Sequence, residues 1–242
     1  MPRRRIRWGR VFLALLFLTG TVFAIRALFS DRRIAIALDA GHGGNDPGAS
    51  GFIEETALTE ATVRELAFLL ENDPSYRVIL CRELSGGAEL NSRWKKARFH
   101  RARLLLSIHG NSADDPSASG FEAYPAPPGR EHHAESLRFA RLLANRIGET
   151  GIRLRGEDGI RYAYYQGSVK ILQDPSAEPL DAPSFAMVDY PGCPAVLAEQ
   201  CFLTNEKDAA LLGSPEGCRR AARQYYLAIC DYFGTEPCAP PS

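Results

Sequence analysis

The sequence of 242 residues has no net charge, because 29 lysines and arginines balance 29 aspartates and glutamates. It also lacks internal repeats and low-complexity segments, and 45% of its residues are hydrophobic. These absences exclude a disordered chain and a collagen-like chain, and the neutral total gives no indication of nucleic-acid binding. The length suits one well-buried domain of ordinary size with a short appendage.

The neutral total hides an uneven distribution of charge. Residues 1–33 contain eight arginines and one acidic residue, which leaves residues 34–242 with a net charge of −7. Five of these arginines precede an uncharged apolar run over residues 11–25, which continues past Arg26 to residue 29. A basic segment followed by an apolar run is typical of a signal peptide or a membrane anchor, and a buried core helix is the alternative. We expect residues 1–33 to send the chain to the periplasm or cell envelope, either cleaved or retained as an anchor over residues 11–29.

Two motifs that carry chemistry are missing. No two cysteines have the CxxC spacing, which argues against a zinc ribbon and a thioredoxin-like site. The glycine-rich loop over residues 41–51 is not followed by Gly-Lys-Ser or Gly-Lys-Thr, so it is not a phosphate-binding loop. Three of the six cysteines lie in residues 218–238, and in an exported domain we expect a disulfide on the C-terminal helix, with free, buried thiols as the alternative.

Strand-like and helix-like segments alternate from residue 34 onward. Short apolar runs cover residues 34–38, 76–81, 104–108, 120–124 and 195–198, and helical spacing covers residues 55–71, 90–99, 131–147 and 206–233. This alternation predicts a single α/β domain over residues 34–233, with a mostly parallel twisted sheet flanked by helices, and a tail over 234–242. Residues 149–190 have no clear periodicity, and we expect a loop or a short hairpin there with an edge strand near 169–172.

Polar residues stand where three of the apolar runs end. They are His42, His109 and Glu199, and the pair Glu54 and Glu55 begins the first long helical segment. Because ligands bind at the carboxyl ends of the strands in such sheets, we expect these side chains to meet at one edge. Two imidazoles and a carboxylate can bind zinc with one position open for water, and a further carboxylate can act as general base. The pattern therefore predicts a hydrolytic zinc site.

Five segments in this order carry a resemblance to a known family. They read LDAGHGGNDPGASG (38–51), EETALTEATVREL (54–66), LLLSIHGNS (104–112), SGFEAYP (119–125) and PAVLAEQCFLTNEKDAALL (194–212). With them the chain resembles the zinc-dependent N-acetylmuramoyl-L-alanine amidases whose metal is held by two histidines and a glutamate. The resemblance covers residues 34 to 233, and five segments that occur in order are a specific signal.

The resemblance implies a role for individual residues. His42 and His109 match the zinc histidines of the family, and Glu199 matches its catalytic glutamate. The zinc glutamate is Glu54 or Glu55, and the spacing to the apolar residue that opens the helix favours Glu55. We expect Asp46, Asn111, Arg93 and Glu122 to have structural roles: the first two in holding loops, the third between helix and sheet, and the fourth at the sheet or its rim.

The implied activity is hydrolysis of the amide bond between N-acetylmuramic acid and L-alanine in peptidoglycan, with Zn²⁺ as the cofactor. A zinc peptidase or deacetylase acting on another envelope component is an alternative, and an inactive wall-binding module is another. We expect peptidoglycan as the partner, no nucleic acid, membrane contact only through the N-terminal segment, and a monomer.

Some members of the family carry an inhibitory helix between the second histidine and the catalytic glutamate, and we expect no long helix in residues 149–190.

Overall fold

A computed structural model of the chain describes residues 12, 17, 19, 21 and 31–238. Its contacts divide the chain into two compact units, residues 1–33 and residues 34–242. Within the described residues, no helix is both long enough and apolar enough to cross a membrane. The signal peptide or anchor expected over residues 11–29 lies largely outside the described residues, so it stays a prediction.

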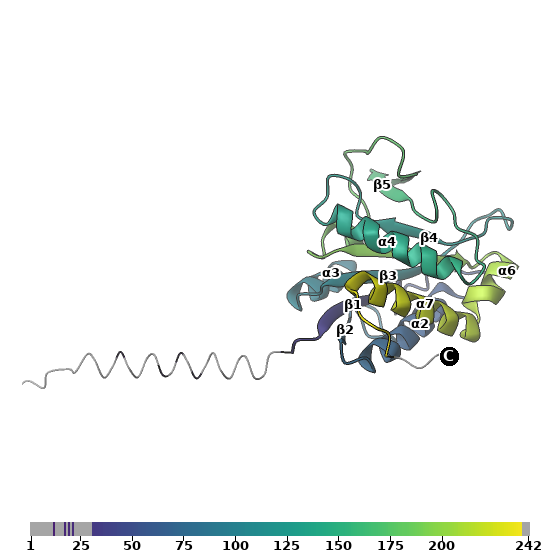
Figure 1. Cartoon of the computed structure of the whole chain (residues 1–242). Helices are drawn as coiled ribbons and strands as arrows, with labels where there is room; N and C mark the ends of the chain where they lie inside the picture. The colour runs from purple at the N-terminus through teal and green to yellow at the C-terminus, as the bar shows by residue number, and fades with distance from the viewer. Residues whose placement is uncertain (1–11, 13–16, 18, 20, 22–30, 239–242) are drawn as a thin grey trace, which may run out of the picture. The chain divides into compact units, whose positions relative to one another are not determined.

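A five-stranded sheet forms the centre of residues 34–242 (Figure 1). Its order is β2 (Tyr76–Leu80), β1 (Ile34–Ala40), β3 (Leu104–Asn111), β7 (Ala195–Phe202) and β4 (Glu122–Pro125). The first four strands are parallel, and β4 runs antiparallel to β7 at the edge. The mostly parallel α/β sheet predicted from the alternation of segments is therefore confirmed.

Two strands are longer than their apolar runs. The expectation that His109 and Glu199 close their strands is wrong, because β3 continues to Asn111 and β7 continues to Phe202. The two strands pair over this extension, and their register shifts between His109 and Asn111. Backbone hydrogen bonding continues a ladder regardless of side-chain polarity, and a local irregularity of this kind turns side chains toward a site.

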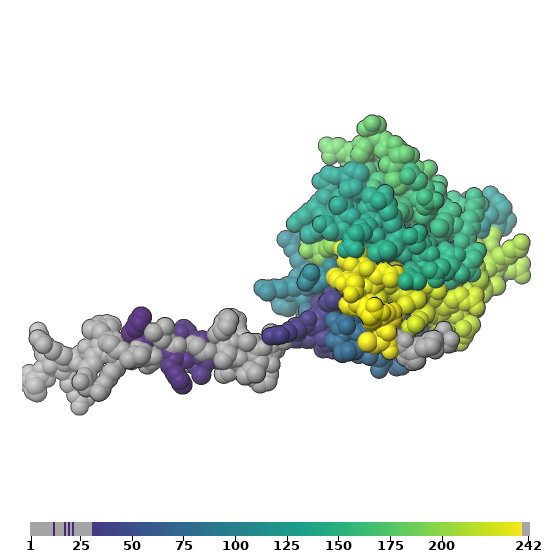
Figure 2. Space-filling view, in the orientation of Figure 1, coloured from purple at the N-terminus to yellow at the C-terminus, as the bar shows by residue number. Residues whose placement is uncertain are grey.

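Alternate residues of each strand enter two separate cores, as the period of two requires. In β1, Ile36 and Leu38 belong to one core, and Ala35 and Ala37 belong to the other. The first core lies under α2 (Glu55–Glu71), α4 (His133–Gly148) and α7 (Pro215–Phe233); we call this side of the sheet the closed face. The second lies under α3 (Leu90–Phe99) and α5 (Ala186–Asp189); we call this side the open face. Figure 2 shows α7 in yellow between α4 and α2.

The C-terminal helical segment begins and ends at residues suited to those positions. The short α6 (Glu206–Asp208) and η1 (Ala209–Gly213) precede α7, so the helical segment predicted over residues 206–233 is interrupted before Pro215. The Ser214 hydroxyl accepts a hydrogen bond from the Gly217 N–H, and Pro215 occupies the first helical turn. Gly234 ends α7 in a left-handed conformation that glycine adopts without strain.

Residues 149–190 contain a hairpin outside the main sheet. Its strands β5 (Tyr162–Gln166) and β6 (Val169–Gln173) pair with each other, which confirms the predicted short hairpin and its edge strand. The helix in this stretch, α5, has four residues, well short of four turns. In Figure 1, β5 stands at the top of the view, beyond α4 and β4.

The expected disulfide on the C-terminal helix is wrong. All six cysteines are free, five of them buried and Cys238 exposed. Cys218 and Cys230 lie on the same helix, 12 residues apart along α7, which separates their backbones by about 18 Å. A disulfide requires Cα atoms within about 7 Å, so these two thiols cannot pair.

Candidate metal centre

A pocket of about 930 Å³ opens at the carboxyl ends of β1, β3 and β7. The short helices α3 and α5 of the open face border the pocket, α3 with Arg93 and α5 with Met187. The pocket lining includes His42, Glu55, Arg93, His109, Lys170, Phe185 and Glu199. The predicted site residues are thus brought together from four separate parts of the sequence.

Two imidazoles converge on one buried carboxylate. Glu55 Oε1 lies 3.1 Å from His42 Nε2 and 3.0 Å from His109 Nδ1, and Glu55 is 3% exposed. The three side chains each offer one ligand atom, and these atoms all lie within 4.8 Å of one another. The same carboxylate accepts hydrogen bonds from the backbone N–H groups of Ala49 at 2.8 Å and Gly110 at 3.1 Å. The cluster offers two nitrogens and one oxygen to a metal ion.

Of the two candidate glutamates, Glu55 is the one that lies with the histidines. It opens α2 and shares the buried side of the helix with Leu58 and Thr59. Glu54 precedes the helix, and its carboxylate accepts a hydrogen bond from the Ser50 hydroxyl at 2.7 Å. The direction of the first helical turn therefore separates two adjacent, chemically identical side chains.

The charges of the cluster stabilise one another when no cation lies between them. Burial acts to raise the pKa of Glu55, but hydrogen bonds from His109 and His42 hold that pKa well below its ordinary value. The hydrogen bond with Glu55 raises the pKa of His42 to about 9, against the opposing effect of burial. At neutral pH the metal-free protein thus holds a proton at His42 beside an ionised Glu55. A metal ion would displace that proton.

His42 is oriented by a second carboxylate behind its ring. Asp46 Oδ2 lies 2.8 Å from His42 Nδ1, on the side of the imidazole opposite Glu55. The other oxygen of Asp46 accepts a hydrogen bond from the Gly48 N–H at 3.1 Å, as expected for a residue that holds its loop. A carboxylate in this position fixes the tautomer and the ring orientation of a metal-binding histidine.

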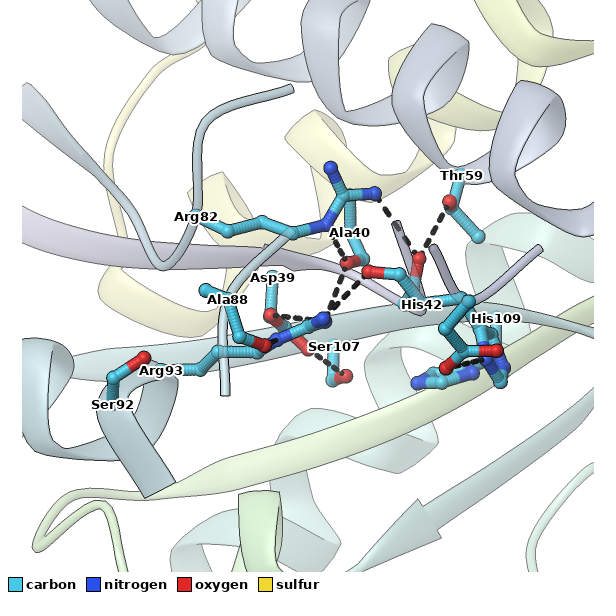
Figure 3. A network of polar contacts seen from close by, with 12 residues as sticks. Asp39, Ala40, His42, Thr59, Arg82, Ala88, Ser92, Arg93, Ser107 and His109 are labelled. Carbon is cyan, nitrogen blue, oxygen red and sulfur yellow. Dashed lines mark hydrogen bonds and ion pairs between the residues drawn. The ribbon is translucent and has the colours of Figure 1, made fainter. Parts of the chain in front are cut away.

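Two buried arginines hold the turn that presents His42 (Figure 3). The backbone of His42 is left-handed, with φ of 57°. Arg82 donates from Nε to the Ala40 carbonyl at 2.8 Å and from Nη2 to the Gly41 carbonyl at 3.2 Å. Arg93 donates from Nη1 to the Ala40 carbonyl at 3.0 Å and from Nη2 to the His42 carbonyl at 2.6 Å. The bridging role predicted for Arg93 is confirmed. These bonds offset the cost of a conformation that residues with a side chain rarely adopt.

Two glycines of the loop leave room for the cluster. A Cβ added at Gly41 would lie 2.5 Å from the His109 ring. A Cβ added at Gly48, where φ is +69°, would lie 2.6 Å from Glu55 Oε2. The glycine-rich sequence after β1 is therefore required by the side chains packed against it.

Glu199 lies beside the cluster on β7. It pairs with His109 of β3 on one side and with Glu122 of β4 on the other, so the three residues form a row across the open face. Glu199 Oε2 is buried and has no hydrogen-bond partner within the described part of the chain. Burial raises the pKa of Glu199 to about 7, while the charge of His109 lowers it. A carboxyl group with a near-neutral pKa can both accept and donate a proton at physiological pH.

The arrangement of two histidines and two glutamates can be compared with known proteins. Residues 36–231 match the family described as N-acetylmuramoyl-L-alanine amidase. The chain belongs to this amidase family. The residues predicted to form a hydrolytic metal site, at three strand ends and the start of a helix, lie within the matched residues.

Individual relatives agree with the family match. AmiB of Haemophilus influenzae, a probable N-acetylmuramoyl-L-alanine amidase, is 29% identical over 222 residues, which cover 81% of this chain and 51% of that protein. AmiC of Neisseria meningitidis, an N-acetylmuramoyl-L-alanine amidase, is 29% identical over 226 residues, which cover 84% of this chain and 54% of that protein. The chain therefore spans about half the length of these curated relatives. The solved catalytic domain of CwlV, an N-acetylmuramoyl-L-alanine amidase from Paenibacillus polymyxa, aligns with a TM-score of 0.67 and 27% identity, covering 84% of this chain and 99% of that one.

This member of the amidase family also contains a structural carboxylate beside Glu199. Glu122 accepts hydrogen bonds from Asn111 Nδ2 at 2.7 Å and the Tyr124 hydroxyl at 2.9 Å. It also accepts from Arg155 Nε and Arg161 Nη1, each at 3.0 Å. Glu122 is thus a fully bonded sheet residue, as expected. The two arginines were not predicted, because they come from the stretch without periodicity and no local pattern pairs them with Glu122.

Proposed function

We propose that this chain is a zinc-dependent hydrolase of the amide bond between N-acetylmuramic acid and L-alanine in peptidoglycan. One observation carries the proposal: His42, Glu55 and His109 converge beside Glu199, whose Oε2 has no hydrogen-bond partner among the described residues, in a chain of the amidase family. The family match indicates which bond is hydrolysed, and the side chains provide the groups that can hydrolyse it.

The three converging side chains fit a zinc ion. His42 Nε2, His109 Nδ1 and Glu55 Oε1 would hold it, and imidazole nitrogen and carboxylate oxygen are ligands that catalytic zinc takes. Three protein ligands leave a further position open to water or substrate. When bound, zinc supplies Lewis acidity to the scissile carbonyl and to a water nucleophile. Asp46 would keep the His42 ring in its binding orientation.

Glu199 would move the proton. Its Oε2 has no internal partner among the described residues, so it can accept a proton from the attacking water. The same oxygen would then donate that proton to the amide nitrogen as the carbon–nitrogen bond breaks. The products are a lactyl carboxylate on the muramic acid and a free amino group on L-alanine. A pKa near 7 suits a group that must take up and release one proton in each turnover.

The proposal includes a location outside the cytoplasmic membrane, because peptidoglycan lies there. The arginine-rich and apolar residues 1–33 support export, and residues 34–242 would then work in the periplasm or cell envelope. Protease digestion of intact spheroplasts tests this: residues 34–242 should be degraded from outside. Complete protection until the membrane is lysed would contradict export.

The activity is tested by digesting purified cell-wall sacculi with the full-length protein and identifying the products by mass spectrometry. We expect stem peptides with a free N-terminal L-alanine, a loss of release after chelation, and recovery with added zinc. The His42→Ala protein serves as the inactive control. Cleavage within the stem peptide, or loss of acetyl groups from the sugars, would contradict the proposed bond and assign the site to a peptidase or a deacetylase.

A further inference from the structure

The charged residues of the pocket differ sharply in how they are bonded. Its acidic lining residues are Asp39, Asp46, Glu55, Glu89 and Glu199, and its basic ones are Arg93 and Lys170. The Arg93 guanidinium is occupied by three backbone carbonyls, including those of Ala88 and His42, and by the Asp39 carboxylate at 3.5 Å. The Lys170 ammonium has no hydrogen bond or ion pair to any described residue. Among the described lining residues, Lys170 is the cation available to bind a ligand.

Lys170 is placed in the pocket wall by a hairpin and an aromatic ring. It lies on β6 opposite Tyr165 of β5, in a hairpin that is separate from the main sheet. The ring of Phe185 packs against Tyr165 with ring centres 5.7 Å apart and against Tyr124 at 5.5 Å. The Lys170 ammonium lies 5.9 Å from the centre of the same ring. Phe185 thus holds the turn end of the hairpin against the sheet and places the ammonium at the pocket.

Lys170 lines the same pocket as His109 and Glu199. A lysine ammonium is a compact charge with three donors, and an unpaired one in an acidic pocket attracts a carboxylate. The amide that Glu199 would help to cleave is followed by a peptide, so a substrate carboxylate within a residue or two of that bond could reach Lys170.

We propose that Lys170 binds a carboxylate of the stem peptide on the leaving-group side of the scissile amide, which makes the site selective for an acidic peptide. This inference rests on the proposed function and adds a specificity residue to it. The β5–β6 hairpin then acts as the part of the wall that recognises the peptide, and the metal-binding cluster and Glu199 act on the bond.

The test compares two synthetic substrates that differ by one group. One is N-acetylmuramoyl-L-alanyl-D-glutamate with a free α-carboxylate, and the other carries a carboxamide at that position. Both carry the γ-carboxyl group as a methylamide, so that no second carboxylate is present. The full-length wild type should show a kcat/KM about three- to tenfold higher for the carboxylate, as expected for one charge-assisted contact in a partly open site. Lys170→Gln should remove this preference through KM, with kcat nearly unchanged. Lys170→Arg should keep it.

The matched control is Lys207→Gln, which removes a lysine on α6 outside this pocket and should leave the preference intact. The preference should also fall as salt is added, because a contact between charges is screened.

Equal cleavage of the two substrates by the wild type would overturn the inference while leaving the proposed amidase function intact. An equal fall of kcat on both substrates in Lys170→Gln would also overturn it, because Lys170 would then act through Glu199. Cleavage of neither substrate by the wild type would overturn the proposed function and the inference together.

Discussion

The two faces of the central sheet are built from the same strands but perform different tasks. The closed face is packed under α2, α4 and α7, which have 17, 16 and 19 residues. The open face is covered by α3 and α5, which have 10 and 4 residues. Polar side chains such as His109 and Glu199 line a pocket on the open face, and Glu55 enters it from the first turn of α2. The closed face thus mainly stabilises the fold, whereas the open face carries most of the candidate site.

Loss of a metal-binding side chain on the open face should have the largest effect on the protein. His109→Ala removes one of three converging ligand atoms and should lower stem-peptide release at least a thousandfold, because the Lewis acid contributes several kcal/mol. Chelated wild type should recover on zinc addition, and the variant should not. His100→Ala removes an exposed histidine at the end of α3 and should keep full activity. Equal losses in the two variants would contradict the assignment.

Removal of a large buried side chain from the closed face should lower the stability of the fold and leave the turnover of the folded protein unchanged. Phe139 is fully buried on α4 and packs against Tyr232 with ring centres 5.3 Å apart. Phe139→Ala should lower the free energy of unfolding by about 3–5 kcal/mol, with turnover per folded molecule unchanged. Phe68→Ala is the control, because Phe68 is 63% exposed on α2 and should matter little. Urea denaturation measures both, and a similar small loss in each would contradict the closed core.

The carboxylate behind His42 should have an intermediate effect. Asp46→Ala frees the His42 ring and should weaken zinc binding by about 10- to 100-fold, with little change in unfolding. Competition with a chromogenic chelator measures the affinity. The control is Asp115→Ala, which removes a similar turn bond to the Ser117 N–H far along the chain. Unchanged zinc affinity in Asp46→Ala would show that the ring is held by the turn alone.

Glu199 should lower the stability of the metal-free protein as it ionises, and we expect this effect to be the smallest of the four. Because burial raises the pKa of Glu199 from 4.5 to about 7, the folded state binds its proton more tightly than the unfolded state. In the metal-free protein the stability gained from protonation is therefore present below pH 4.5 and is lost as the pH rises to 7. The difference in unfolding free energy between wild type and Glu199→Gln should shift by about 1–2 kcal/mol across this range, since the residue is partly exposed. Parallel pH profiles for the two proteins would contradict the raised pKa.

Features of the fold that depend on local sequence could be predicted on both faces of the sheet. Apolar runs and helical spacing predicted the order of strands and helices, because each depends on residues close together in the chain. His42, His109 and Glu199 could be singled out because each stands at the end of an apolar run, and the side of the first helix favoured Glu55 over Glu54.

Contacts between residues far apart in the sequence could not be predicted from local sequence patterns. Glu122 is held by Arg155 and Arg161, which lie 33 and 39 residues away in a stretch without periodicity. The role of Lys170 depends likewise on the folding of β6 over Phe185. The disulfide expectation failed because closeness in sequence along α7 does not give closeness of two thiols in space.

The most direct test of the account is to measure zinc content and turnover together in Glu199→Gln and Glu55→Gln. In the proposed function the pocket holds a metal-binding cluster, to which Glu55 belongs, and a separate proton-transferring group, Glu199. Glu199→Gln should keep one zinc per chain while losing stem-peptide release, and Glu55→Gln should lose both. Retained release in Glu199→Gln, or loss of its zinc, would contradict the division on which the proposed function depends.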